Sequence, residues 1–347
     1  MTDKHSATAN WHDDLASLNE LYKDVQEDHK VDVGISPKVQ LYKENKLRLY
    51  QYEALPVKQK KTPLLIVYAL VNRPFITDLQ PDRSLVLRLL EAGYPVFLID
   101  WGYPDESDKF TSLDDYINGY LYRCMQQIHR HTNSKKIDLL GVCQGGVFSL
   151  CYSALYPESI RKVITLVTPI NFHCDESPLS HWVSGIKLPM ANASPSNIPG
   201  KLLTHFFKAM RPYLLNRDKY RDLSKRIKTS TQLETFLRME KWINDSPDLA
   251  GKAATEFIEK FYQKNGFLND NLTIGKKTVQ LNKITSPVLN LFAENDHIVP
   301  ASSSQALAQL VKPDLYTEST LEGGHIGAFT RVSSQKKLIT TLKKWLG

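Results

Sequence analysis

The chain has 347 residues, of which 42% are hydrophobic, so it is long enough to bury a large core as one α/β domain with an insertion. Its formal net charge is +7, but no nucleic-acid-binding motif accompanies the basic residues, so we expect a solvated basic surface and no nucleic-acid partner. The four cysteines form no CxxC pair and no cluster at zinc-ligand spacing, which argues against a structural metal and a disulfide framework.

The N-terminal residues predict a helix rather than a targeting signal. Residues 1–15 are polar and mixed in charge, unlike a secretory signal. Apolar residues in 11–25 recur at three- and four-residue steps, which predicts an amphipathic helix in a helical or flexible segment, 1–34. The longest apolar run, 64–71, has eight residues, whereas a membrane-spanning helix needs about 20. We therefore expect a cytoplasmic protein without a transmembrane segment.

The next residues predict a hairpin followed by alternating strands and helices. Segments 39–42 and 46–52 alternate as an antiparallel hairpin should. The predicted strands that follow are 63–70, 95–99, 137–140, 163–167, 288–292 and 314–317. The predicted helices among them are 83–92, 113–130, 147–156, 303–311 and 335–345. Buried strands interleaved with helices favour a mostly parallel sheet with helices on both faces.

The alternation stops between residues 170 and 283. This stretch is rich in proline and has helical patterns at 201–210 and 233–242. We interpret it as a helical cap, or lid, inserted into a core made of 35–169 and 284–347. Its prolines and charges favour a mobile cap over a rigid insertion.

A nucleophile motif lies between a predicted strand and a predicted helix. Cys143 is the central residue of GVCQGG at 141–146, and a GxCxG pattern after a strand and before a helix is typical of the nucleophile elbow of the α/β-hydrolase fold. The glycines two residues on either side keep the strand and the helix clear of the strained turn. We therefore predict an α/β-hydrolase fold in which Cys143 is the nucleophile.

An elbow of this kind needs an acid and a histidine later in the chain. Asp296 follows the predicted strand 288–292, where the acid belongs, and Glu294 is its nearest competitor. His325 lies in a glycine-flanked loop before the last predicted helix. We predict a catalytic triad of Cys143, His325 and Asp296.

Acyl transfer also needs donors for the negative charge that develops on the carbonyl oxygen. By position, the backbone N–H of Gln144 supplies one, and the loop after strand 63–70 supplies the other, for which Val71 is the candidate. The alternative for Val71 is ordinary packing at a strand end.

The choice of sulfur as the nucleophile also matters, because exchange of an acyl thioester onto a cysteine is nearly isoenergetic and leaves the acyl group activated for onward transfer.

Four motifs are spread over the chain: GVCQGG at 141–146, DWGYP at 100–104, NRP at 72–74 and GGHIG at 323–327. Together they resemble the catalytic subunit of a class III polyhydroxyalkanoate synthase, from about residue 35 to the end of the chain. Class I synthases are similar in this core but carry a long N-terminal extension. Class IV chains usually have methionine at the position of Gln144.

The resemblance implies an acyltransferase that polymerises (R)-3-hydroxyacyl-coenzyme A, chiefly the 3-hydroxybutyryl thioester, with release of coenzyme A. Cys143 would carry the growing polyester, His325 would deprotonate the thiol, and Asp296 would orient His325 or help to activate the substrate hydroxyl. No cofactor or metal is implied, since coenzyme A is the leaving group of the substrate. The resemblance further implies a second, non-catalytic helical subunit, a homo- or hetero-oligomer, and a location at the surface of cytoplasmic polyester granules.

Two other functions fit parts of the pattern. A cytosolic thiol hydrolase or thioesterase of the dienelactone-hydrolase type shares the fold and a GxCxG elbow, but the large insertion favours an enzyme that keeps water from an acyl-cysteine. A non-catalytic granule-associated scaffold would not need three residues in the catalytic order.

Overall fold

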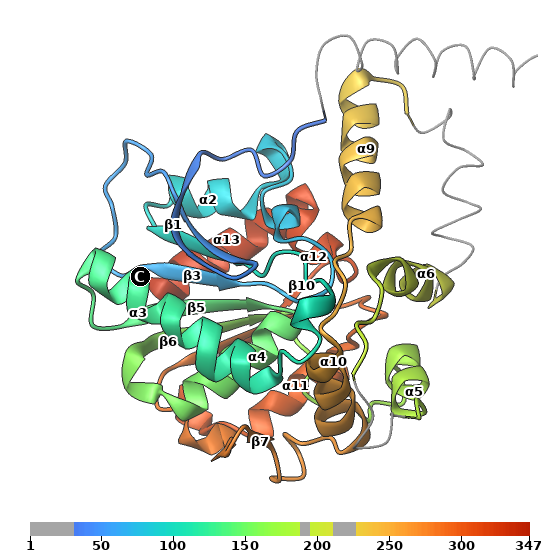
Figure 1. Ribbon diagram of the computed structural model, residues 1–347. Coiled ribbons are helices and arrows are strands. Elements are labelled where there is room, and N and C mark those ends of the chain that lie inside the picture. The colour runs from blue at the N-terminus through green and yellow to red at the C-terminus, as the bar shows by residue number, and fades with distance from the viewer. Residues whose placement is uncertain (1–30, 188–194, 211–226) are drawn as a thin grey trace, which may run out of the picture.

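The computed structural model describes residues 31–187, 195–210 and 227–347, so the predicted helix at 11–25 lies outside the described residues. The main element is an eight-stranded sheet in the order β1-β2-β4-β3-β5-β6-β9-β10 (Figure 1). β1 and β2 form the predicted hairpin, β2 runs antiparallel to β4, and the remaining pairs are parallel. The strands are β1 (Lys38–Glu44), β2 (Leu47–Tyr52), β3 (Leu64–Val67), β4 (Val96–Asp100), β5 (Ile137–Val142), β6 (Ile160–Leu166), β9 (Val288–Ala293) and β10 (Tyr316–Leu321).

Helices cover both faces of this sheet, as predicted. The α-helices of the described residues are α2 (Leu85–Glu91), α3 (Tyr122–Thr132), α4 (Gln144–Leu155), α5 (Pro178–Ser184), α6 (Gly200–Met210), α9 (Ser230–Asn244), α10 (Gly251–Phe257), α11 (Ala301–Gln305), α12 (Gly327–Thr330) and α13 (Val332–Leu346). No helix among the described residues is both long and apolar enough to cross a membrane.

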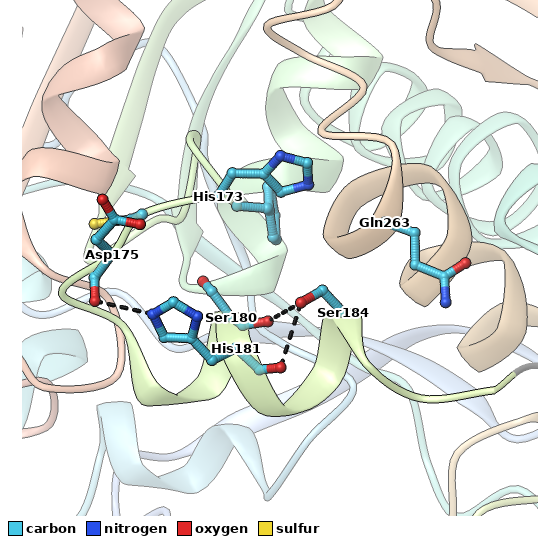
Figure 2. A pocket seen from close by; sticks show the side chains of 8 residues that line it. His173, Asp175, Ser180, His181, Ser184 and Gln263 are labelled. Carbon is cyan, nitrogen blue, oxygen red and sulfur yellow. Dashed lines mark hydrogen bonds between the residues drawn. The ribbon is translucent and has the colours of Figure 1, made fainter.

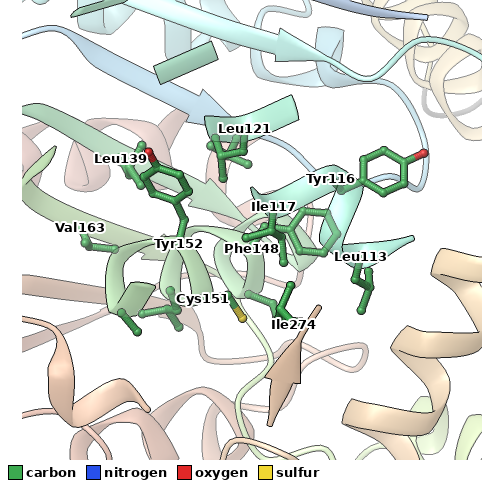
Figure 3. Close-up of a cluster of buried hydrophobic side chains, with 14 of the residues drawn as sticks. Leu113, Tyr116, Ile117, Leu121, Leu139, Phe148, Cys151, Tyr152, Val163 and Ile274 are labelled. Carbon is green, nitrogen blue, oxygen red and sulfur yellow. The ribbon is translucent and has the colours of Figure 1, made fainter. Parts of the chain in front are cut away.

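The side chains of β3 show why both faces need cover. Leu64 and Ile66 point into a hydrophobic cluster with α2 and α13, whereas Leu65 and Val67 point into a second cluster with α3 and α4. All four are fully buried, as expected for a central strand of a parallel sheet, because successive side chains face opposite sides. Figure 3 shows part of the second cluster, in which Phe148 of α4 lies beside Ile117.

The predicted elements differ from the observed ones mainly at their ends. The last strand, β10, begins at Tyr316 rather than at residue 314, because Pro313 opens a short 3₁₀ turn, Pro313–Leu315. The predicted helix 303–311 is instead α11 followed by a 3₁₀ turn, Ala306–Gln309. The helix predicted at 147–156 begins earlier, at Gln144, directly after the elbow.

The described part of the predicted cap, 170–283, divides into two groups. Residues from α10 onward, such as Phe257, Phe261 and Ile274, belong to the hydrophobic cluster of the sheet. The helices α5, α6 and α9 lie beyond the carboxyl ends of the parallel strands (Figure 1), and α6 exposes Leu202 to solvent. Among the described residues of this segment, the part that covers the strand ends is therefore made of α5, α6 and α9.

Candidate active site

Cys143 occupies a sharp turn between β5 and α4. Its φ of 53° lies in the left-handed region, which residues other than glycine rarely adopt. The strand and the helix approach so closely that a Cβ at Gly141 would lie 2.4 Å from the Cα of Gly146, and a Cβ at Gly145 would lie 2.0 Å from the carbonyl oxygen of Val67. This geometry is that of a nucleophile elbow, and it explains the glycines on both sides of Cys143.

The elbow glycines give a prediction about stability. We expect Gly145→Ala to lower the free energy of unfolding by about 1–3 kcal/mol, because its Cβ overlaps the backbone of β3. Gly185→Ala is the matched control, since the nearest atoms to a Cβ there are 3.7 Å away. Urea unfolding of both variants measures the difference. Equal stabilities would contradict the close approach of β3 and α4.

Asp296 and His325 form a buried pair. The Nδ1 of His325 lies 2.7 Å from Oδ2 of Asp296, and Oδ1 of Asp296 accepts hydrogen bonds of 2.9 Å from the backbone N–H groups of Ile298 and Val299. Glu294, the competing acid, is exposed on the loop after β9. The structure therefore pairs His325 with Asp296, and the turn after β9 fixes the carboxylate.

The other side of His325 faces the nucleophile. The Cys143 side chain interacts with the His325 ring, whose Nδ1 is already directed at Asp296, so Nε2 is the ring nitrogen left for the thiol. Burial lowers the pKa of His325, but Asp296 and Cys143 outweigh it and raise the pKa to about 10. A positively charged imidazolium beside the sulfur stabilises the thiolate, which is the reactive form of cysteine.

The four thiols differ in accessibility. Cys143 is partly exposed, whereas Cys124, Cys151 and Cys174 are buried. Burial raises the pKa of the Cys124 and Cys151 thiols well above the usual range. We therefore expect substoichiometric iodoacetamide at neutral pH to alkylate Cys143 first, which peptide mass spectrometry measures. Preferential labelling of Cys174 would contradict this order of reactivity.

The two predicted oxyanion donors belong to the start of α4 and to the loop after β3. Gln144 is the first residue of α4, where a backbone N–H has no partner within the helix. Among the hydrogen bonds of the described residues, the N–H of Val71 donates none, and Val71 is partly exposed. The N–H of the preceding Leu70 donates instead to Oε1 of Gln144 at 3.0 Å. This side-chain contact, which joins the two loops, was not part of the sequence prediction.

Two tyrosines that interact electrostatically with Cys143 also had no sequence signal. Burial raises the pKa of Tyr68 and of Tyr262, and the Cys143 side chain raises both further. Tyr68 directly follows β3, and Tyr262 comes from the inserted segment. Aromatic residues are common in any core, so only the fold brings these two within electrostatic range of Cys143.

A cavity of about 440 Å³ is lined by residues of the inserted segment (Figure 2). His173 donates from Nε2 to the carbonyl oxygen of Tyr262 at 2.9 Å, and the ring of Phe172 packs on that of Tyr262. The lining consists of Phe172, His173, Cys174, Asp175, Ser180, His181, Ser184 and Gln263. None of the three predicted catalytic residues lines it. Among the described residues, no group of three or more His, Cys, Asp or Glu side chains is placed to hold a metal ion.

Comparisons with known proteins agree on the fold. Residues 62–332 match the family described as alpha/beta hydrolase fold. A monoacylglycerol lipase from Paleococcus ferrophilus superposes with a TM-score of 0.52 at 17% identity, covering 86% of this chain and 98% of the lipase. This similarity confirms the predicted α/β-hydrolase fold and carries no information about the substrate.

The curated relatives are more specific. Residues 5–89 match the family described as Poly-beta-hydroxybutyrate polymerase (PhaC) N-terminus. A poly(3-hydroxyalkanoate) polymerase subunit PhaC from Allochromatium vinosum is 47% identical, over 91% of this chain and 90% of that protein. The subunit of the same name from Synechocystis is 39% identical, over 91% of this chain and 85% of its own. The chain therefore belongs to the poly(3-hydroxyalkanoate) polymerase family, PhaC, within the α/β-hydrolase fold.

Proposed function

We propose that this protein is the catalytic subunit of a class III polyhydroxyalkanoate synthase, which polymerises (R)-3-hydroxyacyl-coenzyme A, chiefly the 3-hydroxybutyryl thioester. The observation that carries the proposal is the contact of the Cys143 side chain, in a left-handed elbow turn, with the buried His325–Asp296 pair. This geometry supports acyl transfer through a cysteine thioester, and the relatives' names supply the substrate class.

In the first step the Cys143 thiolate attacks the carbonyl carbon of the substrate thioester. The negative charge that develops on the carbonyl oxygen is stabilised by the backbone N–H groups of Gln144 and Val71. The bond to the sulfur of coenzyme A then breaks, and the leaving thiolate takes the proton that His325 holds on Nε2. The products are an acyl-Cys143 thioester and free coenzyme A.

In the second step a 3-hydroxyl oxygen attacks the carbonyl carbon of an acyl-Cys143 thioester. His325 accepts the hydroxyl proton while Asp296 stabilises the imidazolium, and the Cys143 thiolate leaves as the new ester bond forms. Each such transfer lengthens the polyester by one unit. The inserted segment, with α5, α6 and α9 beyond the strand ends, keeps water from hydrolysing the thioester.

The assembly and location follow from the same proposal. The class III assignment adds a second, non-catalytic helical subunit that joins the chain in an oligomer. Opening of the inserted segment by this partner would admit the substrate. The enzyme would act at the surface of polyester granules in the cytoplasm.

One assay separates the proposal from its rivals. The full chain receives (R)-3-hydroxybutyryl-coenzyme A, alone and with a candidate helical subunit, while coenzyme A and insoluble polymer are measured. We expect coenzyme A release together with polymer, and more of both with the partner. Soluble 3-hydroxybutyrate without polymer would favour the thiol hydrolase. No release under either condition would favour the non-catalytic scaffold.

A further inference from the structure

The loop that carries Val71 is held by a tryptophan from the inserted segment. Trp242, near the end of α9, donates from its indole Nε1 to the carbonyl oxygen of Arg73 at 2.9 Å. In the opposite direction, Nδ2 of Asn72 donates to the backbone carbonyl oxygen of Trp242 at 3.1 Å. Trp242 is 7% exposed, and both hydrogen bonds are partly buried.

The conformation of this loop needs such support. Asn72 has a φ of 59°, a left-handed conformation that asparagine tolerates better than most residues but that still requires fixing by its surroundings. On the side of the elbow, the Leu70 N–H is bound by the Gln144 side chain. Val71 therefore lies between two fixed points, one provided by the elbow and one by α9.

A second set of contacts joins the same loop to the end of α9. Arg73 pairs with Asp100 at 2.5 Å, and its guanidinium group lies 4.1 Å from the centre of the Tyr103 ring. The Tyr103 hydroxyl donates to Asp245, directly after α9, at 2.8 Å. The motifs NRP at 72–74 and DWGYP at 100–104 thus form, with α9, one connected support for the loop.

The packing of α9 is consistent with this role. Met239, Trp242 and Ile243 contribute to the same hydrophobic cluster as Tyr68 and the partly buried Cys143. The end of α9 therefore packs into the same cluster as the elbow residue Cys143.

We infer that Trp242 is a positioning residue for acyl transfer, which holds the Val71 N–H in the place where the oxyanion develops. This inference rests on the proposed function. Docking of α9 then completes the oxyanion hole. When α9 moves away from the strand ends, the Cys143–His325 pair remains but the Val71 N–H is misplaced.

The test is Trp242→Phe, which keeps a large ring and removes the indole N–H. Loss of an oxyanion donor lowers kcat by about 10²–10³, and a misplaced group costs about 10², so we expect kcat to fall about 10- to 100-fold with KM little changed. Both (R)-3-hydroxybutyryl-coenzyme A and p-nitrophenyl acetate serve as substrates. Alkylation of Cys143 by iodoacetamide, which forms no oxyanion, should keep its wild-type rate.

Trp345→Phe in α13 is the matched control, because the Trp345 indole N–H makes no hydrogen bond to the described residues, and it should leave all three rates unchanged. Wild-type kcat in Trp242→Phe would overturn the inference. So would an equal fall in the alkylation rate, since the damage would then lie in the Cys143–His325 pair. If the proposed function fails, the wild type releases no coenzyme A from the thioester. Hydrolysis of p-nitrophenyl acetate then still compares Trp242→Phe with Trp345→Phe.

Discussion

Replacing Cys143 by alanine is expected to abolish both coenzyme A release and polymer formation. Cys143 alone among the four cysteines is partly exposed and contacts His325, so no other thiol can form the acyl-enzyme. Removal of a nucleophile from a catalytic triad costs on the order of 10⁶ in kcat in a serine protease, and we expect turnover to fall below detection. The measurement is coenzyme A release by chromatography, together with the mass of insoluble polymer.

Cys151→Ala is the matched control for this variant. Cys151 lies on α4, two turns beyond the elbow, and is fully buried. Its replacement removes one sulfur atom from the core and should reduce stability moderately while turnover remains. Activity above a trace in Cys143→Ala, or its loss in Cys151→Ala without unfolding, would contradict the role of Cys143.

Replacing Asp296 by asparagine is expected to reduce turnover strongly and to leave the fold intact. The amide keeps the volume and can still accept the two backbone hydrogen bonds, but it removes the charge that raises the pKa of His325. The corresponding change costs on the order of 10⁴ in a serine-protease triad, whereas a thiol is easier to deprotonate, so we expect a loss of about 10² in the acylation of Cys143. Elongation should suffer more, because a hydroxyl needs a stronger base.

Single-turnover acylation and steady-state polymer formation, measured separately, test this difference between the two steps. Glu294→Gln is the matched control, since this exposed carboxylate follows the same strand, and it should retain wild-type rates. Wild-type acylation and polymerisation in Asp296→Asn would move the acid role to another residue.

The sequence was informative where function imposes a local pattern. The elbow needs glycines at fixed positions, and a Cβ at Gly145 would overlap the backbone of β3. Central strands such as β3 are buried on both faces, so they appear as continuous apolar runs. The edge strand β10 has only Leu321 buried, and without an apolar run its start was predicted two residues too early.

The sequence was uninformative where the site depends on contacts between distant segments. The pattern of α9 predicts a helix, but nothing in it shows that Trp242 binds the loop at Asn72. Tyr262 comes within electrostatic range of Cys143 only because α10 and the π-helix that continues it, Ile258–Gln263, pack against the sheet. Such contacts depend on how the inserted segment folds back over the strand ends, which periodicity does not specify.

Mass spectrometry of the acylated protein tests the central claim most directly. The full chain is mixed briefly with (R)-3-hydroxybutyryl-coenzyme A, quenched in acid and digested. The account predicts that the peptide containing Cys143 gains the mass of one or more 3-hydroxybutyryl units, and that this label disappears on treatment with hydroxylamine, as expected for a thioester. Label on another residue, or coenzyme A release with no acyl group on Cys143 at any time, would contradict it.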